Sequence, residues 1–288
     1  QRWDLTIVTS NRHARTPGRV TQGARRHGLT LPPELGNVRT LMNPDITRLL
    51  DGWAFDPEAN VRKIEGEDGI AKIQVRVDQG AFQGILQLNL DGRPDGKRPY
   101  DTDYVLDHYR LLSKQEDHES AFGLDAAACR ELFDESARIY GRYVFLLQIK
   151  EYERVVTDTE RNMQLFRFVH RFAEQEKDRD NLQKWWPYIL RIHATAQAML
   201  AANQDDYDQA LKILADTRQQ IGALREIEAE EFFLERDRSL EALDELTEEL
   251  AANRPLSERE RLEQELEAAI SSEEFERAAQ LRDRLREI

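Results

Sequence analysis

The sequence predicts an α+β protein that is mostly α-helical, with a small antiparallel sheet in its first half and a helical hairpin at its C-terminal end. Three observations lead to this fold class. Residues 60–90 alternate apolar and polar side chains between tight-turn signals, as half-buried strands do. Residues 124 to about 225 repeat apolar side chains at helical spacing. Residues 256–288 contain two short helical patterns.

Composition restricts the class of protein. One third of the 288 residues are charged and the net charge is −14, which disfavours broad contact with nucleic-acid phosphates. The single cysteine, Cys129, excludes an intrachain disulfide and a zinc site built on a cysteine cluster. No apolar run approaches the roughly 18 residues of a membrane helix. We expect a soluble, cytoplasmic protein of the interaction type, without membrane contact.

The first forty residues differ from the rest of the chain. They contain seven arginines, no lysine, and only Asp4 and Glu34 as acids. Glycine and proline are frequent, and neither an apolar core nor helical periodicity is present, as a targeting peptide would require. We expect residues 1–41 to be a disordered or non-native extension, with Met42 as the natural start. A basic arm that binds nucleic acid is the alternative.

Residues 42–120 are expected to form a small α+β domain. A short helix and a three-stranded meander follow from the pattern, and glycines close the turns between strands. The loop 91–99 carries three cations and two glycines, but it lacks phosphate-loop spacing, so we expect a solvated connector. The predicted elements are a helix at Ile46 to Leu50 and strands at Val61 to Ile64, Ile70 to Val77 and Phe82 to Leu90.

Residues 124–225 are expected to form a helical, repeat-like domain. In two places an aromatic residue opens a new helix and a small residue follows three positions later: Tyr152 with Val155, and Tyr207 with Ala210. This spacing resembles the inter-helix turn of tetratricopeptide repeats. The two tyrosines lie 55 positions apart instead of the regular 34, and Tyr143 replaces a small residue, so any repeat pair is degenerate. The resemblance implies stacked helical hairpins, and a groove that binds peptides is a further hypothesis.

One aromatic segment of this region allows a functional and a structural interpretation. The aromatic run at residues 185–188 lies beside Lys184 and Arg191, as in surfaces that stack on bases. We favour a core role, because Trp186, Leu190 and His193 share one helix face.

Residues 226–252 combine a leucine stripe with an acidic outer face, which predicts an acidic helical stalk ending near Pro255.

The C-terminal segment, residues 256–288, predicts an antiparallel helical hairpin. Ser257 with Glu260, and Ser271 with Glu274, match the capping-box spacing, so each serine is expected to begin a helix. A hairpin of this size buries little apolar surface, so we expect it to complete its core against a second copy or another protein. Self-association through residues 225–288 is the prediction. The alternative is that the leucine stripe folds back on Leu211, Leu214 and Ile221 of the same chain.

The run of residues 274–283, EFERAAQLRD, closely resembles the UVR motif (UvrB/UvrC motif) that the B and C subunits of the bacterial excinuclease share. That motif also occurs in regulators of Clp proteases, which pair it with zinc-binding cysteines that this chain lacks. The resemblance implies a protein-binding hairpin and partners in nucleotide excision repair or Clp-type proteolysis. The residues expected to bind the partner are Leu262, Leu266, Phe275, Glu276, Ala278, Ala279, Leu281, Arg282 and Asp283.

No catalytic constellation emerges from the sequence. The chain lacks the GxxxxGK[ST] loop that the motor of an excinuclease B subunit needs, and Cys129 has no histidine near it in sequence. We therefore expect no enzyme activity, no cofactor and no metal. The leading hypothesis is a non-enzymatic adaptor or scaffold. The alternatives are a DNA-binding repair accessory that uses the arginine-rich N-terminus and Trp185–Trp186, and a sensor whose sheet domain binds a small molecule.

Overall fold

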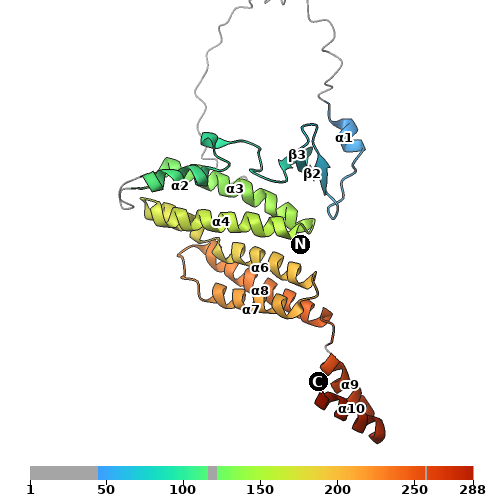
Figure 1. Cartoon of the computed structure of the whole chain (residues 1–288). Helices are drawn as coiled ribbons and strands as arrows, with labels where there is room; N and C mark the ends of the chain where they lie inside the picture. The colour runs from blue at the N-terminus through green and yellow to red at the C-terminus, as the bar shows by residue number, and fades with distance from the viewer. Residues whose placement is uncertain (1–44, 116–121, 257, 288) are drawn as a thin grey trace, which may run out of the picture. The chain divides into compact units, whose positions relative to one another are not determined.

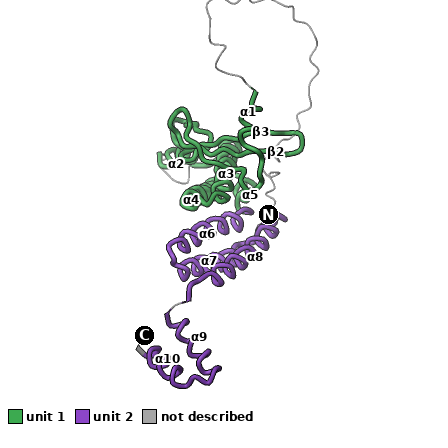
Figure 2. Tube along the Cα trace, turned by 90° about the vertical axis from the view of Figure 1, so that its right-hand side faces the viewer, with its two compact units in different colours: residues 1–183 green, residues 184–288 purple. Residues whose placement is uncertain are grey.

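The computed structural model describes residues 45–115, 122–256 and 258–287. The chain divides into two compact units, residues 1–183 and 184–288, which are coloured separately in Figure 2. The prediction for residues 1–41 lies outside the described residues. The division at 183/184 falls inside the region that we predicted as one helical domain, and the predicted domain boundaries stay predictions.

A three-stranded antiparallel meander follows the short helix α1 (Thr47–Asp51), as the alternating pattern predicted. The strands are β1 (Val61–Glu65), β2 (Ala71–Gln79) and β3 (Phe82–Asn89), in the order β1-β2-β3 (Figure 1). Gly69 and Gly80 have φ of 72° and 59°, a left-handed backbone that glycine adopts without steric cost. These two glycines allow the tight turns that join the strands.

The two faces of the sheet differ in polarity. Ile73 and Val75 are buried on one face, opposite Leu88 and Leu86 of β3. Lys63 lies on the same face and pairs with Glu151. On the other face Arg62 donates to Gln74, which donates to Gln87, and Trp53 stacks on the Arg62 guanidinium. The apolar face of the sheet therefore packs toward the helices of the same unit.

The helices of the first unit are built around a long hairpin. It consists of α3 (Ala126–Gln148) and α4 (Tyr152–Phe172), and α2 (Val105–Gln115) and α5 (Glu176–Gln183) flank it (α2 to α4 in Figure 1, α5 in Figure 2). A 3-10 turn, η2 (Pro99–Asp101), precedes α2. Asp125 begins α3 by accepting hydrogen bonds from the backbone of Ala127 and Ala128, as an N-cap does. The hairpin buries a continuous apolar core that includes Leu132, Ile139, Leu146, Val155, Leu165 and Val169.

The loop 91–99 is attached more tightly than the sequence suggested. Arg142 of α3 donates through Nη1 to the carbonyl oxygens of Asn89 and Gly92, at 3.1 and 2.7 Å. Pro94 is buried, and its carbonyl accepts a hydrogen bond from the Asn89 amide. Most of the loop is exposed, as expected of a solvated connector, but Gly92 and Pro94 attach it to the rest of the unit.

In the second unit α6 (Trp186–Ala202), α7 (Tyr207–Gly222) and α8 (Glu230–Asn253) pack against one another. Phe232, Leu243 and Leu250 of α8 are buried, as are Leu214 and Ile221 of α7. The predicted stalk is therefore wrong. The leucine stripe folds back on the same chain, which is the alternative that the sequence left open, and it leaves the outer acidic face of α8 in solvent. Self-association through this stripe loses its basis.

The C-terminal hairpin comprises α9 (Glu258–Ser271) and α10 (Phe275–Glu287). Its small core consists of Leu262, Ala269, Ala278 and Leu281, with Leu266 and Leu285 packed against it. Ser271 is the last residue of α9 and does not begin α10, so the capping box predicted with Glu274 is wrong. Ser257, the other predicted cap, lies outside the described residues.

Candidate functional site

One type of turn closes three helical hairpins of the described chain: α3–α4, α6–α7 and α9–α10. In each, a residue other than glycine has a left-handed backbone, with φ of 60° at Lys150, 60° at Asp205 and 59° at Glu273. The amide of that residue donates to the carbonyl three positions back, and the next amide donates five positions back, which is a Schellman ending.

The sequences of the three turns correspond position by position. An acidic residue follows the left-handed one, then an aromatic residue, a second acid, Arg or Gln, and a small or β-branched residue. The amide of this last residue donates to the carbonyl of the first acid and starts the next helix. Acidic side chains in the first helical turn also interact favourably with the positive end of the helix dipole and so stabilise the helix. The corresponding segments are residues 150–155, 205–210 and 273–278.

The environment of the aromatic residue separates the third hairpin from the other two. Tyr152 is only 8% exposed, and Tyr207 is partly buried in the hairpin that α8 packs against. Phe275 is 69% exposed, and Ile270, on the other side of the same turn, is 55% exposed. The structure thus presents two large apolar side chains to solvent at the turn of the α9–α10 hairpin.

The predicted partner-binding residues fall into two groups. Leu262, Ala278 and Leu281 form the core of the hairpin, with Leu266 packed against them. The other five are exposed: Phe275, Glu276, Ala279, Arg282 and Asp283. Phe275 does not belong to the core of its own hairpin. Its role at a contact with another molecule stays a prediction. Ile270 is not among the predicted residues.

Charged side chains lie beside the exposed turn, where Arg277 of α10 is 3.3 Å from Glu274 and 3.9 Å from Glu265. A further pair, Arg284 with Glu258 at 3.9 Å, lies at the opposite end of the hairpin. All of these side chains are at least two-fifths exposed, so each pair contributes little to stability. An apolar centre with a charged rim is the usual composition of a protein-binding surface.

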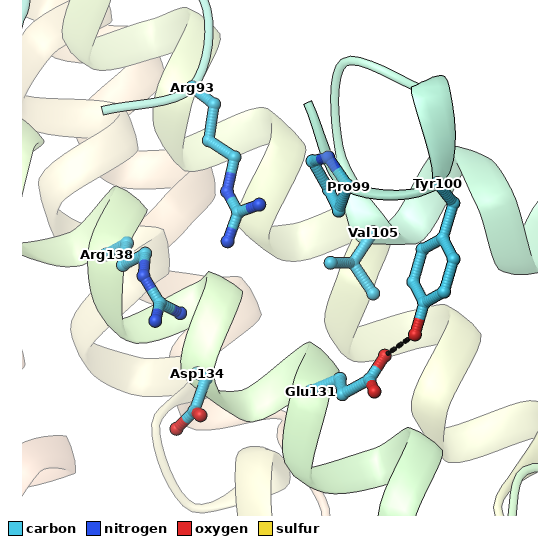
Figure 3. A pocket seen from close by; sticks show the side chains of 7 residues that line it. All are labelled: Arg93, Pro99, Tyr100, Val105, Glu131, Asp134 and Arg138. Carbon is cyan, nitrogen blue, oxygen red and sulfur yellow. Dashed lines mark hydrogen bonds between the residues drawn. The ribbon is translucent and has the colours of Figure 1, made fainter. Parts of the chain in front are cut away.

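A pocket of about 350 Å³ lies between the loop 91–99, the start of α2 and α3 (Figure 3). Tyr100 donates to Glu131 at 2.7 Å, and the carboxylate of Asp95 lies 3.3 Å from Arg93 and 3.4 Å from Arg138. The lining mixes both signs of charge, so it provides no concentrated field for one class of ligand. Its seven lining residues are Arg93, Pro99, Tyr100, Val105, Glu131, Asp134 and Arg138.

The pKa values near this pocket follow from burial. Burial raises the pKa of Glu135 to about 7, although the backbone N–H of Val105 donates to both of its carboxylate oxygens. Burial and the charge of Glu131 raise the pKa of Tyr109 far above its usual range. Burial also raises the pKa of Cys129 to about 11, so its thiol is protonated at neutral pH and is a poor nucleophile.

Part of the aromatic run at residues 185–188 has the expected core role, whereas Trp185 and Tyr188 are only partly buried. Trp186 and Leu190 are buried in the core of the second unit. Lys184, the cation beside them, is paired with Glu231 at 2.9 Å. Within the part of the chain that the structure describes, no group of three or more His, Cys, Asp or Glu side chains could hold a metal ion. The helices described there include none that is long and apolar enough to cross a membrane.

Comparisons with known proteins agree with the resemblance of the C-terminal hairpin. Residues 257–288 match the family model described as the UvrB/uvrC motif. Neither the curated proteins nor the solved structures include a match to this chain. This motif is found in UvrB, UvrC and related proteins and mediates contacts between proteins. The chain therefore carries a UvrB/uvrC motif, and α9 and α10 are its two helices.

Proposed function

We propose that this protein is a non-enzymatic adaptor that binds a protein partner through the turn of its C-terminal hairpin. The observation that carries the proposal is the exposure of Phe275 and Ile270 at that turn. Large apolar side chains at the centre of a polar rim supply most of the binding energy in protein interfaces. The core of the hairpin is already closed by other residues, so these two side chains are available for a partner.

Comparison within the chain supports this choice of surface. The α6–α7 hairpin has the same turn, and α8 of the same chain packs against both of its helices. A partner that contributes helices could supply the equivalent cover for α9–α10. The resemblance favours partners in nucleotide excision repair or in Clp-type proteolysis, and the adaptor role is the same in both.

The DNA-binding alternative has less support. Trp186, one of its two proposed stacking residues, is buried, and Lys184 is paired with an acid. Its remaining basis is the arginine-rich N-terminal segment. Binding of a fluorescent DNA duplex by the full chain at about 150 mM salt tests it. Micromolar or tighter binding with a steep salt dependence would favour the accessory role over the adaptor.

The adaptor proposal is tested by affinity purification of the tagged full chain from its native cell. We expect the Phe275→Ala variant to lose specific partners that the unmodified chain retains. Leu111→Ala is the matched control, because Leu111 is an exposed apolar residue of α2 outside the hairpin. If both variants recover the same partners as the unmodified chain, the turn is not the binding surface.

A further inference from the structure

The outer edge of β3 pairs with no other described strand. In an antiparallel sheet, every second residue of a strand directs its backbone N–H and C=O groups toward the same neighbouring strand, and the residues between them direct theirs to the opposite side. The amide of Leu90 donates to the carbonyl of Ala71, so the even-numbered residues of β3 face β2. Gln83, Ile85 and Gln87 therefore direct their backbone groups away from the sheet. None of the described residues forms a backbone hydrogen bond with these three on that side.

The two edges of the sheet differ in how they are protected. The residues of β1 include Arg62, Lys63 and Glu65, and charged residues are a common protection of edge strands against pairing. The sequence of β3, FQGILQLN, has no charge and no proline, in a chain whose residues are one-third charged. The short helix α1 lies beside β3, but none of its residues is buried. Among the residues that the structure describes, none supplies the usual protection to the edge of β3.

Exposed apolar side chains accompany this edge. Leu86 is paired with Val75 and Phe82 with Gln79, so both lie on the apolar face of the sheet. Val75 is buried, whereas Leu86 is 48% exposed and Phe82 is 78% exposed. The apolar face thus continues to the free edge beyond the part that the helices cover.

We infer that β3 pairs with β3 of a second copy, antiparallel about a two-fold axis at Gly84, to form a continuous six-stranded sheet. An edge strand without charges can pair with a second copy of itself without bringing like charges together in any register. β3 meets this condition and β1 does not.

The register follows from the side chains. An axis at Gly84 places Phe82 of each copy opposite Leu86 of the other copy. The two exposed apolar residues therefore cover each other in two symmetric pairs. It also pairs Gln83 with Ile85 of the second copy, which uses backbone groups that point outward. At Asn89 the amide already donates to Pro94 of the same chain, and the new pairing ends before that residue.

Gly84 provides the test. A Cβ atom built on it meets no atom within 4 Å, and its φ is outside the left-handed region, so a side chain fits there in the monomer. In the inferred dimer, the two Gly84 residues form a non-hydrogen-bonded pair with Cα atoms about 4.5 Å apart, which is within disulfide range. The native Cys129 is buried and does not compete.

We expect full-length Gly84→Cys to form a covalent dimer under mild oxidation at least tenfold faster than Glu65→Cys, which carries an exposed thiol on the β1 edge. Gly84→Lys should sediment as a monomer, because two ammonium groups meet on the axis. An equimolar mixture with Gly84→Glu should restore a heterodimer through the opposite charges. Gly84→Ala, which adds no charge, should remain dimeric.

These measurements separate the β3 interface from association through the C-terminal hairpin when every variant also carries Phe275→Ala. Equal oxidation rates of the two cysteine variants would overturn the inference. So would an unchanged mass for Gly84→Lys, or a Gly84→Lys and Gly84→Glu mixture that stays monomeric. None of these outcomes bears on the adaptor role, which is tested by Phe275→Ala alone.

Discussion

Arg142 and Asp158 form a buried ion pair that joins α3 to α4. Arg142 Nε donates to Asp158 Oδ2 at 2.8 Å, and Nη2 donates to Oδ1 at 2.6 Å. The third nitrogen, Nη1, donates to the carbonyl of Asn89, the last residue of β3, and to the carbonyl of Gly92 in the loop that follows. A single guanidinium therefore connects the helical hairpin to the sheet, and both charged side chains are almost completely removed from water.

The first prediction concerns this pair. Arg142→Met leaves Asp158 buried without its partner, and we expect the free energy of unfolding to fall by about 3–5 kcal/mol. The control is Arg154→Met, which removes the ion pairs of a partly exposed arginine with Asp91 and Glu151 and should cost about 1 kcal/mol or less. Urea unfolding followed by circular dichroism measures both. Equal losses for the two variants would contradict the assignment of the buried pair.

A second prediction concerns pH. Burial raises the pKa of Glu135 to about 7, above its unfolded value near 4.5, so the folded state binds more protons between these two values. This contribution to stability is present at pH 4.5 and below and is lost as pH rises through about 7. The loss is on the order of 2–3 kcal/mol.

Glu135→Gln removes the titration, so we expect the difference in unfolding free energy between the unmodified chain and the variant to change between pH 5 and pH 8. The unmodified chain should lose stability relative to the variant as pH rises. Urea unfolding at several pH values gives this difference directly. A difference that does not vary with pH would show that Glu135 titrates near its normal value.

The sheet was predictable because its signals are local. Alternating side chains and two glycines in tight turns defined the three strands, and the structure confirms them within one or two residues. The predicted stalk failed for a non-local reason. An apolar stripe shows that a helix face is covered, but not which molecule covers it, and α6 and α7 of the same chain do so here.

The functional residues also divide into those with a local sequence signal and those whose environment depends on contacts distant in sequence. The hairpin was recognised from a short run of residues, whereas the exposure of Phe275 depends on how the hairpin closes. Ser271 matched the spacing of a capping box, but the chain turns two residues later, at Glu273. The pairing of Arg142 with Asp158 had no local signal. It follows once the turn is placed at Lys150, because the two residues lie eight positions on either side of it.

The third prediction concerns the shared turn. Glu273 has a φ of 59°, which costs a residue with a Cβ atom roughly 1 kcal/mol relative to glycine. We expect Glu273→Gly to stabilise the C-terminal hairpin by up to about 1 kcal/mol, measured as slower amide hydrogen exchange in α9 and α10. Glu267→Gly, in the middle of α9, is the control and should have the opposite effect. Faster exchange in Glu273→Gly would show that its backbone is not strained.

The last prediction separates the core of the hairpin from its surface. Leu281→Ala removes a buried side chain and should cost about 2–5 kcal/mol of local stability. Phe275→Ala removes a side chain that is mostly in water, so amide exchange in α9 and α10 should change little. Partner binding should be lost in both variants, through unfolding of the hairpin in one and through loss of contact in the other. If Phe275→Ala accelerated amide exchange as much as Leu281→Ala does, Phe275 would be part of the hairpin's own core. Its assignment as an exposed side chain at the turn would then be wrong.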